Sequence, residues 1–154
     1  MLEKFADLLS ANLILGLAVV AWFVAQVLKF LINLVIHKRL DIELLLSSGG
    51  MPSSHSSFVC AAATAIGCLE GFGSSLFALS VVLALVVMYD ACNVRRAAGE
   101  QARILNYIVE HWEEISPAMV GKELKELLGH TPMQVLMGAL LGIVIGCFGV
   151  QWLG

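Results

Sequence analysis

Charged residues are scarce in this sequence: Asp, Glu, Lys and Arg make up 14% of its 154 residues, whereas 59% are hydrophobic. A mean hydropathy of +0.89 excludes an ordinary soluble domain and indicates a small integral membrane protein. We expect one domain, residues 1–154, with an all-α fold: a bundle of about four membrane helices plus an amphipathic cytoplasmic helix.

Cysteine pairs and metal-binding motifs are missing as well. The four cysteines are scattered without a Cys-x-x-Cys pair, and no histidine stands at metal-ligand spacing. The sequence therefore supports neither a disulfide framework nor a zinc site. Residues 1–10 lack the basic start and the small-residue cleavage site of a signal peptide, and we interpret them as an interfacial helix.

Four apolar segments are the expected membrane helices, at about residues 13–36, 56–69, 76–89 and 133–153. The first and last meet the roughly 20 residues of a bilayer crossing, whereas the middle two are short and could form a tilted pair or a partly re-entrant hairpin. In the last segment, small residues recur at four-residue intervals: Gly138, Gly142 and Gly146. This stripe predicts tight helix packing, either within the bundle or in a homo-oligomer.

Basic residues gather on one side of this topology. Most of the nine Lys and Arg residues fall in the two loops that four spans would place on one face: Lys38, Arg39, Arg95, Arg96, Arg103, Lys122 and Lys125. By the positive-inside rule this face is cytoplasmic, and both termini then lie outside.

One polar stretch, residues 47–57 with the sequence SSGGMPSSHSS, separates the first two apolar segments. Its glycines permit a close turn, Pro52 suits the first turn of a helix, and Ser53 or Ser54 can cap that helix. Amide groups at a helix start favour an anion, and His55 in the first turn could donate or accept a proton. The alternative is a serine-rich cap with an incidental histidine.

The first span also carries a polar face, because Gln26, Lys29, Asn33 and His37 recur at helical spacing. We interpret this face as the wall of an internal cavity that contains a cation. The alternative is that Lys29 extends along the helix to the lipid headgroups.

The third span leads into a second group of polar residues. Their helical spacing predicts an amphipathic helix that continues over the membrane surface. Asp90 is near enough in sequence to pair with Arg95 or Arg96. That pair is either a structural salt bridge or a way to hold one guanidinium ready for a phosphate, with Glu100 in support.

A second turn, residues 129–134, places His130 beside Pro132 at the cytoplasmic start of the last span. Two histidines at two helix starts on one face, with cations and amides nearby, suit phosphoryl transfer. One imidazole would attack phosphorus, the other would protonate the leaving alkoxide, and the cations and amides would hold the remaining oxygens. This scheme requires no metal.

Three strings carry a family resemblance: GGMPSSHS at 49–56, MYDA at 88–91 followed by VRRAAGEQA at 94–102, and ELLGHTP at 126–132. Together they resemble the divergent branch of the type-2 phosphatidic acid phosphatase family, also described as acid phosphatase/vanadium-dependent haloperoxidase-related. The match covers nearly the whole chain in order. It implies a membrane-embedded, metal-independent lipid phosphatase without a cofactor.

The resemblance also implies roles for single residues. The family motif Pro-Ser-Gly-His is similar to residues 52–55, which implies His55 as the general acid with Ser53 on the phosphate. The later His-x-x-x-Asp motif resembles residues 130–134, which implies His130 as the nucleophile. The family's first motif, a Lys followed by an Arg, is matched loosely by Lys29 and Arg39.

Two departures from the family pattern concern the nucleophile. Gln134 stands where the family has a carboxylate, and a glutamine can accept the ring N–H of His130 but cannot supply the charge. No Arg lies just upstream of His130, so Arg95 or Arg96 would take that role from the preceding helix.

The sequence thus predicts a phosphatase of the plasma or an organellar membrane, acting on a lipid phosphomonoester or pyrophosphate through a phosphohistidine at the cytoplasmic face. Its expected partners are the bilayer and the lipid phosphate, with no nucleic acid. The rival hypothesis is a non-catalytic binder or carrier of a phosphorylated lipid that has lost turnover through Gln134.

Overall fold

The computed structural model describes residues 11–37, 50–111 and 129–154. Their helices follow in the order α2 (Leu13–His37), α3 (Ser54–Glu70), α4 (Ser75–Tyr89), η2 (Asp90–Val94), α5 (Arg95–His111) and α6 (Pro132–Leu153). These described residues contain no strand, and the predicted all-α fold is confirmed. The interfacial helix expected in residues 1–10 lies outside them.

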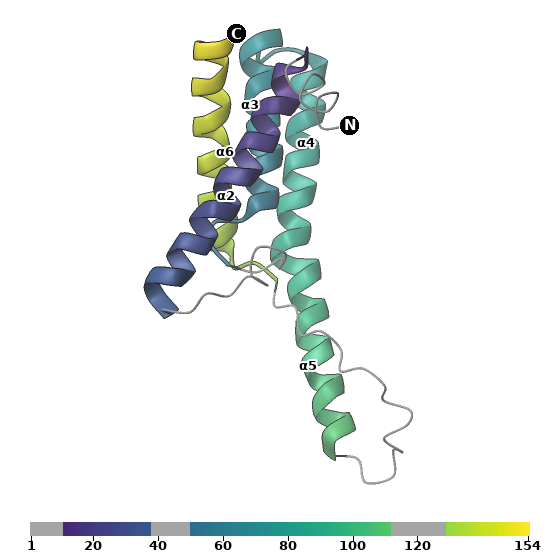
Figure 1. Cartoon of the computed structure of the whole chain (residues 1–154). Coiled ribbons are helices and arrows are strands. Elements are labelled where there is room, and N and C mark those ends of the chain that lie inside the picture. Colours follow the sequence, from purple (N-terminus) through teal and green to yellow (C-terminus); the bar gives the residue numbers. More distant parts are fainter. Residues whose placement is uncertain (1–10, 38–49, 112–128) are drawn as a thin grey trace.

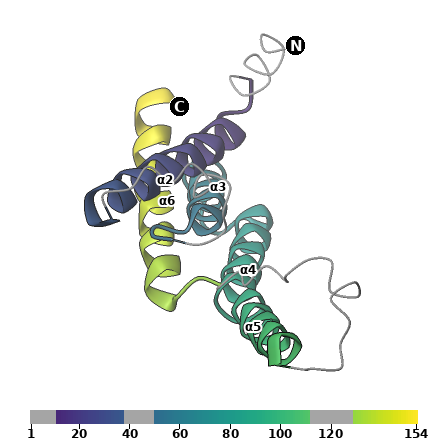
Figure 2. The ribbon, with the colours of Figure 1, turned by 60° about the horizontal axis from the view of Figure 1, so that its bottom comes forward.

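The helices form a bundle with α3 at its centre, packed against α2, α4 and α6 (Figure 1). Helix α3 can occupy this position because its inward residues are small: Ala61, Ala63 and Ala65 are buried. Helices α3 and α6 run in one direction and α2 and α4 in the other (Figures 1 and 2). The starts of α3 and α6 therefore lie at the same end of the bundle.

The glycine stripe of α6 packs against the backbone of α3. A Cβ at Gly138 would collide with the carbonyl oxygen of Ser53, and one at Gly142 with that of Ser57. A Cβ at Gly146 would come within 2.8 Å of the carbonyl oxygen of Ala61. Of the two expectations for Gly138, Gly142 and Gly146, packing within the bundle is confirmed. These three glycines are not available for a homo-oligomer, whose existence stays a prediction.

Helix α4 continues through η2 into α5 without a break in the chain of helical residues. Five residues form a π-helix at this point, a widened turn that is rare in proteins and common at functional sites. The expected amphipathic helix after the third span is thus present as α5. It keeps the direction of α4 and projects beyond the end of the bundle (Figure 1), and its place over the membrane surface stays a prediction.

Three segments of the described chain are long and apolar enough to cross a membrane: 13–36, 75–109 and 132–153. They match the first, third and fourth predicted spans. Helix α3, the second, has 17 residues, which at about 1.5 Å per residue is roughly 25 Å, slightly less than a bilayer core of about 30 Å. It is shielded from lipid by its central position.

Candidate functional site

The starts of α3 and α6 are joined by a backbone hydrogen bond. The N–H of Ser53, the residue that caps α3, donates to the carbonyl oxygen of Gln134 in the first turn of α6 at 3.0 Å. His55 lies in the first turn of α3, and His130 directly precedes the residue that caps α6. Both histidines predicted from the sequence are therefore brought to one end of the bundle, on neighbouring helices.

The start of α3 is buried and rich in hydroxyl groups. Ser53 is the N-cap, as predicted. Its Oγ accepts hydrogen bonds from the N–H of Ser56 at 3.4 Å and from the hydroxyl of Ser56 at 3.0 Å. Ser53, Ser54 and Ser56 are all at most 3% exposed. Pro52 precedes the cap, so its expected place in the first helical turn is wrong. Of the helix-start amides, that of Ser56 is already used, whereas that of Ser54 has no acceptor within the helix.

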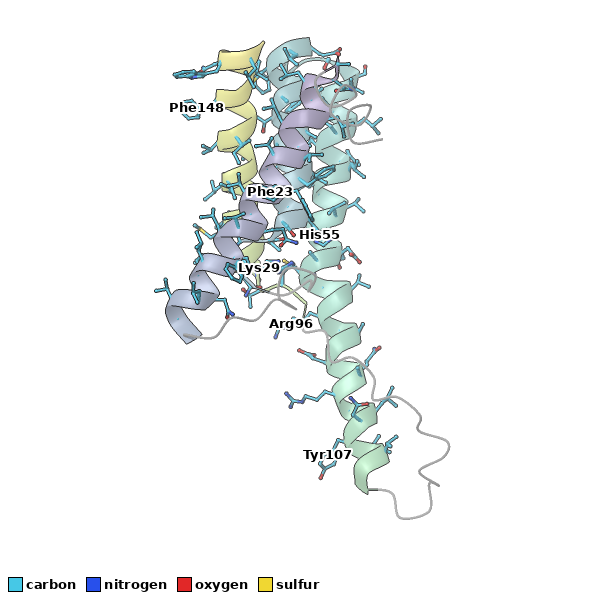
Figure 3. The ribbon with its side chains drawn as sticks, viewed as in Figure 1. Phe23, Lys29, His55, Arg96, Tyr107 and Phe148 are labelled. Carbon is cyan, nitrogen blue, oxygen red and sulfur yellow. The ribbon has the colours of Figure 1, made fainter. Side chains whose placement is uncertain are left out.

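Lys29 reaches this region from α2. It is 2% exposed, and its Cγ lies 3.0 Å from the position that a Cβ on Gly50 would occupy. Gly50 has a φ of +89°, which favours glycine, and its missing side chain leaves room for the lysine stem. Figure 3 shows Lys29 and His55 at the same end of the bundle. Because Lys29 is buried, the alternative that it extends to the headgroups is wrong.

The start of α6 fixes the orientation of His130. Thr131 caps the helix: its Oγ1 accepts from the N–H of Gln134, and Oε1 of Gln134 accepts from the N–H of Thr131 at 3.0 Å. A backbone N–H can only donate, so the side-chain atom of Gln134 facing it is the carbonyl oxygen. The same Oε1 lies 3.2 Å from Nδ1 of His130. Since this oxygen only accepts, Nδ1 carries the proton.

The neutral tautomer of His130 follows from that contact. With the proton on Nδ1, the lone pair of the ring is on Nε2, which is buried. The ring as a whole is 1% exposed. The N–H of His130 donates to the carbonyl oxygen of Ala91 in η2 at 3.0 Å, so the π-helical turn holds the histidine from the other side. A carboxylate is thus not needed to select the tautomer that a nucleophilic imidazole requires.

Of the arginines predicted to bind phosphate, only Arg96 has a described side chain, so they are not seen together at the helix starts as the two histidines are. Nε of Arg96 donates to Oε1 of Glu100 at 3.2 Å, and both side chains are more than half exposed. The ion pair of Arg96 is therefore with Glu100 and not with Asp90, as had been one expectation. Asp90 itself begins η2. Arg95 begins α5, but the position of its side chain is not described, and Arg39 lies outside the described residues.

Two features of this site were not predicted from the sequence. The π-helical turn has no sequence signal that a single chain reveals. The double use of Gln134, as the third residue of a capping box and as the partner of His130, is encoded in the spacing Thr131-x-x-Gln134, which matches the capping-box pattern. Within the described residues, no three His, Cys, Asp or Glu side chains are grouped as metal ligands would be.

The fold and site define a helical membrane protein with two histidines at adjoining helix starts. Comparison with known families agrees: residues 10–145 match the divergent PAP2 family, and the chain belongs to it. It is also 42% identical over 131 residues to the uncharacterized membrane protein YuiD of Bacillus subtilis strain 168, covering 79% of this chain and 83% of that protein. No solved structure gives a significant match.

Proposed function

We propose that this protein is a membrane-embedded phosphatase that hydrolyses a lipid phosphomonoester or pyrophosphate through a phosphohistidine on His130. The observation that supports it most is the contact between Nδ1 of His130 and Oε1 of Gln134, because it leaves Nε2 as the nucleophilic atom. Membership of the divergent PAP2 family supports a phosphatase-related function.

In the first step, Nε2 of His130 attacks phosphorus and the bond from phosphorus to the leaving oxygen breaks. The leaving alkoxide, or phosphate in the case of a pyrophosphate, takes a proton from His55. Gln134 keeps the ring in position and accepts from Nδ1–H while the imidazole becomes positively charged. Burial of His130 shields the reacting atoms from bulk water.

In the second step, water attacks the phosphohistidine and gives its proton to His55. The phosphorus–nitrogen bond breaks, inorganic phosphate leaves, and Nε2 regains its lone pair. The ammonium group of Lys29, the hydroxyl of Ser53 and the amide of Ser54 would hold the phosphoryl oxygens in both steps. Helix α3 would supply this anion site through the amide of Ser54 at its start, which has no acceptor within the helix.

We infer that the site faces the cytoplasm. Helix α5, which contains Arg95, Arg96 and Arg103, extends from the end of the bundle at which α3 and α6 begin (Figure 1). Basic residues that follow a span favour the cytoplasmic side.

The second candidate function is a binder or carrier of a phosphorylated lipid without turnover. One observation favours it: the partner of His130 is the neutral Gln134, which does not offset the positive charge that develops on the imidazole. Gln134→Glu distinguishes the two. If the parent protein is a working enzyme, this substitution should change its rate of phosphate release little. If it is a binder that has lost turnover, the substitution should raise that rate from near zero.

The proposal is tested by phosphate release from phosphatidate, a polyprenyl phosphate and hexadecyl phosphate, with protein purified in detergent and EDTA present. We expect release that vanadate inhibits. His130→Ala should abolish it, and His55→Ala should lower it about 10²- to 10⁴-fold, the usual contribution of a general acid.

His111→Ala is the matched control, since His111 is the last residue of α5, which projects away from the bundle (Figure 1). It should keep the parent rate. Full activity in His130→Ala would contradict the nucleophile assignment, and absence of release from every lipid phosphate would favour the binder.

A further inference from the structure

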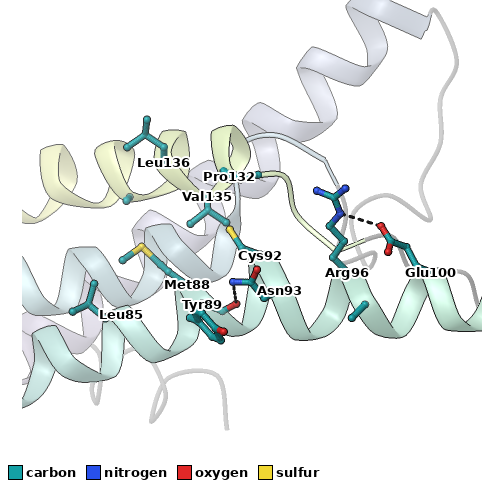
Figure 4. A pocket seen from close by; sticks show the side chains of 12 residues that line it. Leu85, Met88, Tyr89, Cys92, Asn93, Arg96, Glu100, Pro132, Val135 and Leu136 are labelled. Carbon is teal, nitrogen blue, oxygen red and sulfur yellow. Dashed lines mark hydrogen bonds and ion pairs between the residues drawn. The ribbon is translucent and has the colours of Figure 1, made fainter.

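An open groove runs between α6 and the continuous helix formed by α4, η2 and α5 (Figure 4). It consists of two adjoining cavities of about 810 Å³ and 400 Å³. Leu85 and Met88 line both cavities, so the two adjoin along α4. The floor is α3, which contributes Cys60, Ala63 and Thr64.

The groove follows one face of each helix. On the α4 side its lining runs from Phe77 to Glu100, which at about 1.5 Å per residue corresponds to roughly 35 Å. On the α6 side it runs from Pro132 to Cys147, or roughly 22 Å. These two lengths lie on either side of the bilayer core of about 30 Å. A long alkyl chain can therefore lie along the groove.

Polarity changes along the groove. The half near Phe77 is lined by apolar residues apart from Thr64. The other half ends in Asn93, Arg96 and Glu100 (Figure 4). Within the described residues, the bond of Arg96 to Glu100 uses Nε, so the two terminal amino groups of the guanidinium can hold an oxyanion as a fork. An apolar trough that ends in this guanidinium, paired through Nε with Glu100, matches an amphiphile with an anionic headgroup.

The polar end of the groove adjoins the turn that carries His130. Ala91, whose carbonyl oxygen accepts from the N–H of His130, lies between Asp90 and groove-lining Cys92. Pro132, two residues after His130, lines the groove as well. A lipid seated in the groove would thus have its headgroup next to the candidate site.

We propose that this groove binds one membrane lipid with a phosphate headgroup, its chain between α4 and α6 and its phosphate at Arg96. The inference rests on the proposed function in one respect, because a long-chain lipid phosphate held at Arg96 would be the substrate on its way to the site, before Lys29, Ser53 and Ser54 hold its phosphoryl group. The binding itself does not depend on turnover.

The test uses two single-cysteine proteins. One keeps Cys92, which is half-buried in the groove, and the other keeps Cys68, which is exposed at the end of α3 outside it. The remaining cysteines are replaced by Ala or Ser, and reaction with N-ethylmaleimide is timed in detergent. Hexadecyl phosphate at ten times its dissociation constant should slow labelling of Cys92 about tenfold and leave Cys68 unchanged.

Headgroup and groove are then tested separately. Hexadecanol and inorganic phosphate should each protect Cys92 much less than hexadecyl phosphate, and Arg96→Gln should remove the advantage of the phosphate. Ala139→Trp, which fills the groove, should remove protection. Ala78→Trp is the control for Ala139→Trp, because Ala78 is exposed on α4 outside the groove lining. In this variant the protection of Cys92 should remain.

Equal protection by hexadecanol and hexadecyl phosphate, or protection that survives both Arg96→Gln and Ala139→Trp, would overturn the proposal. His130→Ala separates this result from the catalytic one, because hexadecyl phosphate should protect Cys92 in this variant as it does in the parent protein. Protection in a protein that releases no phosphate would support the groove and contradict the proposed hydrolysis.

Discussion

Helix α6 presents two faces that differ in how they are filled. Toward α3 its glycines meet the backbone of the neighbouring helix, and Gly138 adjoins Ser53 at the candidate site. Toward α4 its larger residues, such as Val135 and Ile143, border an open groove. The closed face fixes the positions of the two histidines relative to each other, and the open face leaves room for a ligand. Residue size along one helix thus separates a rigid part from an accessible one.

Adding a side chain to the closed face of α6 should cause the largest loss of stability. In Gly142→Val the added side chain would collide with the carbonyl oxygen of Ser57, and we expect a loss of about 3 kcal/mol in stability. Thermal unfolding in detergent measures it. Gly73→Val is the control, since a Cβ at Gly73 would have no atom within 4 Å. Equal unfolding temperatures for the two variants would contradict the tight contact.

Lys29→Met tests the charge at the candidate site without removing the packing of the Lys29 stem. Methionine keeps an apolar stem beside Gly50, so the fold should be retained. Loss of the ammonium group should lower phosphate release about 10²-fold, the cost of removing one oxyanion donor. Steady-state rates on the same lipid check this, and an unchanged rate would remove Lys29 from the site.

The junction at α6 can be sharpened by comparing Gln134→Ala with Thr131→Ala. Both remove part of the capping box and should cost about 1 kcal/mol in stability. Only Gln134→Ala also removes the acceptor of His130, and it should lower the rate about 10- to 100-fold more. If both variants lose the same activity, the glutamine acts through the helix cap and not through the histidine.

Ser57→Ala should have the smallest effect. It removes the bond from Oγ of Ser57 to the carbonyl oxygen of Ala21, which links α3 to α2 at 3.1 Å. We expect a loss of about 1 kcal/mol in stability with an unchanged rate per folded molecule. Denaturation together with activity assays measures both. A large loss of activity would mean that the α2–α3 contact positions Lys29 in the site.

Much of this arrangement could be predicted from the sequence, because local patterns encode it. Hydrophobic runs predict α2, α4 and α6, and Ser53 and Thr131 carry ordinary N-cap signals. The glycine stripe predicts a close contact, but its partner depends on the tertiary arrangement, so a homo-oligomer was an equal alternative. The groove and the bond from His130 to Ala91 join distant segments, and no spacing in the chain reveals them.

The most direct test of the central claim is to locate the phosphoryl group during turnover. The purified protein is mixed with a lipid phosphate labelled at phosphorus, quenched within milliseconds under alkaline conditions, digested and analysed by mass spectrometry. The arrangement around His130 predicts transient phosphorylation of Nε2 of that residue, absent in His130→Ala. Hydrolysis with the label on Nδ1, on His55 or on no histidine would contradict it.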